Sequence, residues 1–167
     1  MKKNNKVKSL ESLSRIVSGL KRQKRTVVFT NGCFDILHYG HAKYLEDSRK
    51  LGDFLVVGLN SDSSVRVVKK DKNRPINSQH DRASVLAALS SVDYIIIFNE
   101  LTPLKLIGKL KPDILVKGGD WNKEDVVGKD IVESYGGRVQ IIPYLKGYST
   151  TNIIKSIIKN SCGKNRK

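Results

Sequence analysis

Short apolar runs alternate with helical patterns along most of the chain. Five runs rich in β-branched and aromatic residues predict buried strands, over residues 26–31, 54–60, 92–98, 113–117 and 138–144. Apolar positions at helical spacing, with capping residues before them, predict helices over residues 9–23, 41–52, 61–68, 79–91, 102–110, 125–137 and 149–159. Strands that alternate with helices are typical of a parallel sheet covered on both faces. We therefore expect an α/β fold with a doubly wound, parallel, five-stranded sheet.

Three unusual segments follow predicted strands. Residues 32–41 contain two histidines three positions apart, residues 117–122 contain a glycine pair, and residues 144–151 end in a run of hydroxyl residues. In a doubly wound sheet, ligands bind beside the carboxyl ends of the strands, where the strand order reverses. Because parallel strands end at the same edge, we expect the three segments to meet on one rim.

Length and composition indicate a globular protein. The 167 residues, 39% hydrophobic and 28% charged, are enough for one core of ordinary size. No apolar run approaches the roughly 20 residues that a membrane helix needs, and the basic N-terminus lacks the apolar stretch of a signal peptide. Cys33 and Cys162 lie far apart and form no metal or redox motif. We expect a cytoplasmic, reducing location and no membrane contact.

The net charge of +15 is concentrated at the two ends of the chain. Residues 1–25 contain nine basic residues and one acid, and residues 155–167 contain five basic residues and no acid. The stretch between them carries 17 basic and 15 acidic residues. A nucleic-acid domain more often carries a basic stripe on its folded core, so binding to nucleic acid is the less favoured alternative. We interpret the chain as a solvated basic segment with an amphipathic helix (1–24), a main domain (25–160) and a basic tail (161–167).

The segment after the first predicted strand is typical of a phosphate site. The chain has no G-x-x-x-x-G-K-[ST] loop and no G-x-G-x-x-G after that strand, so P-loop hydrolysis and hydride transfer lose support. Gly32 permits a tight exit from the strand, and His38 and His41 flank Gly40 where a helix should open at His41. Imidazoles and helix-start amides donate hydrogen bonds to phosphate, and Gly40 leaves room for it. A zinc site competes with this interpretation, but only one further histidine and no thiol pair support it.

This segment resembles the HxGH signature of the nucleotidyltransferase superfamily, whose members transfer a nucleoside monophosphate from a triphosphate to a phosphate acceptor and release pyrophosphate. The hydroxyl run at residues 149–151 is similar to their second signature, although one such residue would suffice as a helix cap. The resemblance implies a Rossmann-like HxGH nucleotidyltransferase fold with His38 and His41 as catalytic residues. The nucleotide-binding residues that we predict are Cys33, Phe34, Gly40, Lys117, Gly118, Asp120, Gly147, Tyr148, Ser149, Thr150 and Thr151.

Within the superfamily, the chain resembles the adenylyltransferases of ADP-heptose synthesis, which join ATP and D-glycero-β-D-manno-heptose 1-phosphate. The similarity covers residues 9–158 and includes "RPINSQHDRASVLAALSSVDYIIIF" and "PDILVKGGDW". The nearest rival is the CTP-dependent cytidylyltransferase branch for glycerol 3-phosphate or a similar polyol phosphate, to which Lys43 is closer. Its R-T-E-G-I-S-T-T pattern, however, places arginine where this chain has Tyr144. An alternative from a different class is a protein that binds nucleic acid or an anionic surface.

Four charged residues have candidate roles that the pattern alone leaves open. Asp35, Lys69 and Arg74 are predicted to bind the acceptor substrate, and the two basic residues could also bind the triphosphate. Turn formation by Asp35 and a solvated loop over residues 69–77 fit the pattern equally well. Arg82, near the start of a predicted helix, is interpreted as a partner in an internal salt bridge.

The glycine-rich segment after the fourth predicted strand is the candidate site for the nucleoside. Lys117 should point its charge toward the rim, and Gly118 and Gly119 allow the backbone to approach the base. Asp120 could contact the nucleoside or cap the next segment. Trp121 could stack near the nucleotide or pack under the loop.

The resemblance implies direct transfer without a covalent enzyme intermediate. An ionised sugar 1-phosphate can attack the α-phosphorus of the nucleotide, so the protein has to align two repelling anions and neutralise charge. Magnesium is the expected cofactor, held mainly by phosphate oxygens and water, with no assigned protein ligand. The expected partners are ATP as co-substrate, a sugar 1-phosphate, a second copy in a homodimer, and a separate upstream sugar kinase. A separate kinase is expected because the chain is too short to contain the kinase domain to which this activity is often fused.

Overall fold

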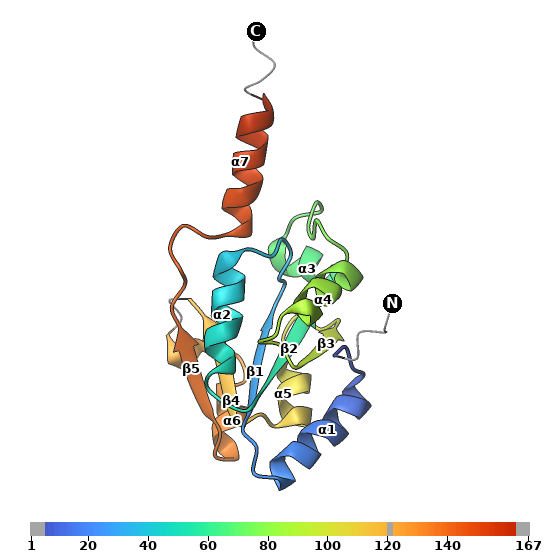
Figure 1. Cartoon of the computed structure of the whole chain (residues 1–167), viewed down its shortest axis with the longest axis vertical. Helices are drawn as coiled ribbons and strands as arrows, with labels where there is room; N and C mark the ends of the chain where they lie inside the picture. Colours follow the sequence, from blue (N-terminus) through green and yellow to red (C-terminus); the bar gives the residue numbers. More distant parts are fainter. Residues whose placement is uncertain (1–5, 120–121, 163–167) are drawn as a thin grey trace.

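A five-stranded parallel sheet forms the centre of the molecule (Figure 1). The computed structural model describes residues 6–119 and 122–162. The strands are β1 (Val27–Gly32), β2 (Phe54–Asn60), β3 (Tyr94–Phe98), β4 (Ile114–Gly118) and β5 (Arg138–Ile142), in the order β3-β2-β1-β4-β5. Every neighbouring pair is parallel, so all five strands end at the same edge. The predicted α/β sheet is confirmed.

Helices cover both faces of the sheet and give the fold three layers. They are α1 (Leu10–Arg22), α2 (Tyr39–Arg49), α3 (Asp62–Lys69), α4 (Gln79–Ala88), α5 (Leu104–Leu110), the 3-10 helix η1 (Lys123–Asp125), α6 (Lys129–Ser134) and α7 (Thr150–Cys162). Helices α1, α5 and α6 bury Leu13, Ile107 and Val132 against one face. Helices α2 and α4 bury Leu45 and Leu86 against the other. Because both faces are covered, the strands are almost continuously apolar.

The strand order reverses at β1, which pairs with β2 on one side and with β4 on the other. The chain leaves β1 toward α2 and leaves β4 toward η1. The two connections therefore diverge from neighbouring strand ends, and in such folds ligands generally bind in the crevice outside a switch point of this kind. The segments that follow β1, β4 and β5 all lie at this edge.

The two edges of the sheet carry different charged groups. At the amino edge, Asp53, Asp93 and Asp113 each accept a hydrogen bond of 2.8 Å from a backbone N–H near the start of a strand. At the carboxyl edge, by contrast, β4 carries Lys117. Each of the three aspartates also forms an ion pair with a basic side chain, Asp53 with Arg25, Asp93 with Arg49 and Asp113 with Lys21, so their charges are balanced at the amino edge.

Part of the basic N-terminal segment is bound to the domain. Residues 6–8 run beside β3 and exchange backbone hydrogen bonds of 2.9 Å with Ile95. Lys21 forms an ion pair of 3.1 Å with Asp113. The segment thereby covers the edge of the sheet, a position where unpaired strand edges are otherwise open to association. The prediction of a solvated segment does not hold for residues 6–22.

Several element boundaries differ from the predictions, and three of them lie in or beside the candidate site or its connections. Helix α2 begins at Tyr39 and not at residue 41, because His38 serves as its N-cap. The helix predicted over residues 125–137 is divided into η1 and α6, since Gly128 adopts a positive φ of 93° between them. Strand β5 ends at Ile142, two residues before the predicted boundary.

Helix α7 projects away from the rest of the fold (Figure 1). Its Ile157 and Ile158 side chains are each 57% exposed. No helix in the described part of the chain is long and apolar enough to cross a membrane.

Candidate active site

The two histidines of the HxGH segment pack against each other at the start of α2. His38 is the N-cap residue, and its Nδ1 accepts a hydrogen bond of 3.3 Å from the backbone N–H of His41. The two rings stack with their centroids 3.8 Å apart and 18° between their planes. Because Nδ1 of neutral His38 is an acceptor, its Nε2 carries the proton and can donate to a ligand. The helix therefore begins with an imidazole donor beside its N-terminal amides, a favourable site for an anion.

Both imidazoles are neutral near pH 7. Burial lowers the pKa of His41 to about 4, and the neighbouring His38 and Lys69 act in the same direction. Burial also lowers the pKa of His38. Among the described residues, Nδ1 of His41 is the only buried side-chain polar atom without a hydrogen-bond partner. Such an atom costs about 1–3 kcal/mol, and the backbone of Ile36 beside the ring partly opposes the lowering of its pKa.

The low pKa of His41 predicts a loss of stability on acidification. In the unfolded chain His41 has an ordinary pKa of 6.5, and in the folded chain its pKa is about 4. Between these two pH values only the unfolded chain therefore binds a proton at His41. The stability contribution is therefore full above pH 6.5 and is lost as the pH falls toward 4. Urea unfolding measures the free energy of unfolding at pH 7.0 and at pH 4.5. Its decrease between the two pH values should be about 2 kcal/mol larger for the wild type than for His41→Gln. Equal losses in the two proteins would show that His41 does not carry this effect.

Gly40 has a different role from the one predicted. A Cβ atom placed there would lie 2.9 Å from Cβ of Tyr148 and 3.1 Å from Nδ1 of His38. The space above Gly40 is thus filled by these two side chains, and the prediction that it is left for a phosphate is wrong for this arrangement. Glycine is required because the chain near Tyr148 crosses close to the start of α2.

Lys117 brings a largely buried positive charge to the carboxyl end of β4, as predicted. Its Nζ donates a hydrogen bond of 2.6 Å to Oδ1 of Asn31, at the end of β1. Burial lowers the pKa of Lys117 to about 8, while the nearby Cys33 acts in the opposite direction. Because Asn31 offers an amide and not a carboxylate, it does not neutralise the ammonium charge. An anionic ligand in the crevice would do so.

Asp35 and Arg74 bind each other. Nε of Arg74 donates to the Asp35 carboxylate at 2.6 Å, and the two side chains are only 10% and 1% exposed, respectively. The backbone N–H groups of Ile76 and Asn77 donate to the same carboxylate at 2.9 and 3.0 Å. Burial opposes ionisation, but these hydrogen bonds and the charge of Arg74 hold the pKa of Asp35 below its usual range. The pair fastens residues 74–77 to the turn after β1, and a contact with the acceptor stays a prediction.

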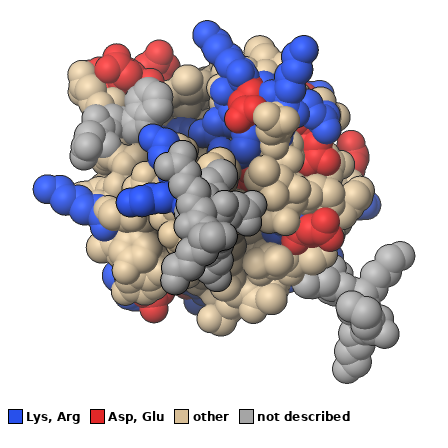
Figure 2. All heavy atoms as spheres, turned by 90° about the horizontal axis from the view of Figure 1, so that it is seen from above, with Lys and Arg blue, Asp and Glu red and all other residues tan. Residues whose placement is uncertain are grey.

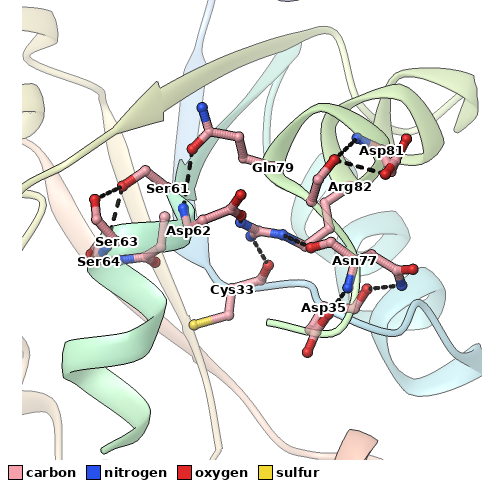
Figure 3. Close-up of polar contacts among 12 residues, drawn as sticks. Cys33, Asp35, Ser61, Asp62, Ser63, Ser64, Asn77, Gln79, Asp81 and Arg82 are labelled. Atoms are coloured by element: carbon pink, nitrogen blue, oxygen red, sulfur yellow. Dashed lines mark hydrogen bonds and ion pairs between the residues drawn. The ribbon is translucent and has the colours of Figure 1, made fainter. Parts of the chain in front are cut away.

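Arg82 lies at the centre of a polar network that holds the site together (Figure 3). Its side chain is 0% exposed and forms an ion pair of 2.8 Å with Asp62 at the start of α3. The same guanidinium donates to the carbonyl oxygens of Cys33, at 2.5 Å, and Asn77, at 3.1 Å. The predicted salt bridge is thus present, but the two carbonyl contacts, which fix the turn leading to His38, were not foreseen. A signal for them was available, because Arg82 shares the apolar face of α4 with Leu86.

The hydroxyl run reaches the same rim. Oγ of Ser149 accepts a hydrogen bond of 3.1 Å from the backbone N–H of Asn152, so this side chain caps α7. Thr150 begins the helix, and Gly147 turns the chain toward it with a φ of 89°. The contact of Tyr148 with Gly40 brings residues 147–151 beside the HxGH segment. Phosphate contacts by this run stay a prediction.

Lysine and arginine side chains gather on the end of the molecule from which α7 projects (Figure 2). The exposed basic residues contributed by α3 and the loop after it are Arg66, Lys69, Lys70 and Lys72. Lys69 is close enough to influence the pKa values of both His41 and Cys33. The predicted nucleotide ligand Asp120, and Trp121 beside it, lie outside the described residues.

Comparison with known proteins identifies relatives of this chain. A family model described as cytidylyltransferase-like matches residues 29–156, which include both signature segments. The bifunctional protein HldE of Syntrophotalea carbinolica is 57% identical over 155 residues, 93% of this chain. The bifunctional protein HldE of Campylobacter concisus is 58% identical over 152 residues, 91% of this chain. The chain spans only 31% of the length of either relative.

Solved structures agree with the fold. The lipopolysaccharide core biosynthesis protein of Thermoplasma volcanium has a TM-score of 0.61 and 33% identity, over 75% of this chain and 99% of that one. The pantoate-β-alanine ligase of Francisella tularensis has the same TM-score at 15% identity, over 90% and 76% of the two chains, and shows only that the fold is shared. Since the family model covers the sheet together with both signatures, the chain belongs to the cytidylyltransferase-like family and is a nucleotidyltransferase.

Proposed function

We propose that the chain transfers AMP from ATP to D-glycero-β-D-manno-heptose 1-phosphate, giving ADP-heptose and pyrophosphate. The observation that carries the proposal is the arrangement at the crevice. The stacked rings of His38 and His41 lie at the start of α2. Lys117 lies near the end of strand β4, where its ammonium group donates a hydrogen bond to the side-chain amide of Asn31. Helix amides, imidazole donors and an ammonium group on one rim suit a polyphosphate.

The choice of acceptor rests on resemblance. The chain resembles heptose 1-phosphate adenylyltransferases over residues 9–158, and a solved relative at 33% identity is a lipopolysaccharide core biosynthesis protein. The HldE relatives are named bifunctional, and the chain spans 31% of their length. The similarity to these relatives therefore concerns about a third of their length.

The CTP-dependent alternative loses one of its supports. Lys43, the residue that is closer to the cytidylyltransferase branch, pairs with Asp47 at 2.6 Å and with Glu46 at 3.7 Å along α2. Its charge is therefore satisfied on the helix surface, and it gives little reason to prefer CTP. The family description still names cytidylyl transfer, so the base has to be tested directly.

In the proposed reaction the protein acts by alignment and charge stabilisation. An oxygen of the sugar phosphate forms a new bond to the α-phosphorus as the bond to pyrophosphate breaks on the opposite side. Hydrogen bonds from His38 and His41 stabilise the negative charge that grows on the triphosphate oxygens, and Lys117 holds an adjacent phosphate. No side chain has to form a covalent bond with the nucleotide.

Magnesium, when bound, would neutralise part of the triphosphate charge. In the described ranges, no group of three or more His, Cys, Asp or Glu side chains could hold a metal ion. Asp35, the carboxylate in the turn after β1, is already occupied by Arg74 and backbone amides. These residues do not form a metal site of their own, so we assign no protein ligand and propose that the ion enters with the phosphates. A homodimer and an upstream sugar kinase are also proposals, based on the resemblance alone.

Pyrophosphate release tests the substrates. With magnesium present, the chain should release pyrophosphate from ATP and heptose 1-phosphate, and much less from CTP or with glycerol 3-phosphate as acceptor. Each nucleotide is assayed with each acceptor under the same conditions, and reactions lacking acceptor measure simple hydrolysis. Release only in the combination of CTP with glycerol 3-phosphate would assign the chain to the cytidylyltransferase branch. Silence in every combination, from folded protein, would remove the substrate proposal.

A further inference from the structure

Three tyrosines on the rim keep large parts of their side chains in solvent. Tyr39 is 57% exposed, Tyr144 66% and Tyr148 49%. The rings of Tyr39 and Tyr148 meet edge to face, with their centroids 5.4 Å apart. Tyr144 is placed differently, because it lies against the glycine pair, Gly118 and Gly119, at the end of β4. Half-exposed aromatic rings beside a phosphate site are the groups on which nucleobases stack.

The ring of Tyr144 rests on the backbone of Gly118 and Gly119. A Cβ atom at Gly118 would lie 3.1 Å from Cε1 of this ring, and one at Gly119 would lie 2.5 Å from Cε2. Only residues without a side chain allow the ring to approach so closely. The backbone N–H of Gly119 donates a hydrogen bond of 2.9 Å to Ile142, which ties the glycine pair to the end of β5. The ring is therefore backed by fixed backbone, while much of its surface stays open to solvent.

We propose that Tyr144 is the stacking platform for the nucleobase of the bound triphosphate and favours a purine over a pyrimidine. Lys117, which directly precedes the glycine pair, would hold a phosphate of the same nucleotide. A purine covers more of the ring than a pyrimidine does, so stacking on Tyr144 favours ATP over CTP. The inference rests on the proposed function, since it names the element of that site which selects the base. It also gives a physical reason for the difference from the cytidylyltransferase branch, whose pattern has arginine where this chain has Tyr144.

Binding to the full chain, without acceptor, tests the inference. Calorimetry with ATP and magnesium should show that Tyr144→Ala weakens binding roughly 5- to 150-fold, as expected for the loss of one base–aromatic stack. The loss for CTP should be smaller, Tyr144→Phe should stay within about threefold of the wild type for ATP, and Tyr144→Arg should lose the preference for ATP. Leu145→Ala, a change at the neighbouring residue that is 40% exposed, is the matched control and should leave both affinities unchanged.

Inorganic pyrophosphate separates stacking from a general loosening of the segment, because it has phosphates but no base. Its affinity should be the same in the wild type and in Tyr144→Ala. An equal loss of pyrophosphate and ATP binding, or ATP binding by Tyr144→Ala within about twofold of the wild type, would overturn the inference. These measurements need no turnover. A chain that selects ATP through Tyr144 but releases no pyrophosphate with heptose 1-phosphate would refute the acceptor and leave this inference standing.

Discussion

Replacing His41 by alanine should lower the turnover of pyrophosphate release by about 100-fold or more, the scale for losing a preorganised donor to developing charge. The ring stacks on His38, is held by the edge of Phe34 at a centroid distance of 5.2 Å, and has a buried Nδ1 without a partner. Such a group is already oriented before the nucleotide arrives, so its hydrogen bond strengthens as charge develops on the triphosphate. Turnover, measured as kcat with saturating ATP, should fall more than the affinity for ATP.

The chain provides a matched control for this change. His80→Ala removes the third histidine, which lies exposed on α4, and should leave kcat unchanged. His41→Asn retains a donor of smaller size and should recover part of the lost activity. A folded His41→Ala protein with wild-type turnover would remove His41 from the catalytic group.

The second large effect is on stability. Arg82→Leu should lower the free energy of unfolding by about 3–5 kcal/mol, the range for breaking a buried ion pair from one side. The change leaves the Asp62 carboxylate without its buried partner and the carbonyl oxygens of Cys33 and Asn77 without their donor. Urea unfolding of the two proteins at pH 7 measures the difference.

Two further variants define what Arg82 contributes. Arg138→Ala removes an exposed arginine from β5 and should change stability by less than about 0.5 kcal/mol. Arg82→Lys keeps the charge but lacks the planar guanidinium that makes the three contacts at once. Its free energy of unfolding should therefore lie between those of the wild type and Arg82→Leu. If the free energy of unfolding of Arg82→Leu is within about 1 kcal/mol of the wild-type value, the network in Figure 3 does not hold the turn before His38 in place.

Sequence patterns predicted the sheet, and the meeting of the segments after β1, β4 and β5 at its carboxyl edge, because strands and their ends follow from local periodicity. The strand predicted over residues 54–60 has the observed bounds Phe54–Asn60, since it is buried on both faces and its apolar run is unbroken. The start of α2 was misplaced by two residues. A histidine is an unusual N-cap, and only the folded geometry shows Nδ1 of His38 accepting from the backbone of His41.

Contacts between distant segments could not be predicted from the sequence in this way. Asp35 meets Arg74 across 39 positions, and Arg82 meets the carbonyl of Cys33 across 49. No periodicity links such residues, so a role in binding substrate and a role in fixing a loop look alike in the sequence. Gly40 was interpreted as space for a ligand for the same reason, because the neighbour that fills that space, Tyr148, comes from a segment more than 100 residues later.

Transfer of the nucleotide itself is tested most directly by following the α-phosphate. The full chain is mixed with magnesium, heptose 1-phosphate and ATP that carries radioactive phosphorus at the α position. We predict that the label moves into a sugar nucleotide, with one pyrophosphate released for each label transferred and none bound covalently to the protein. Label that stays in ATP, appears only as free AMP, or becomes attached to the folded chain would contradict the proposed direct transfer to the sugar phosphate.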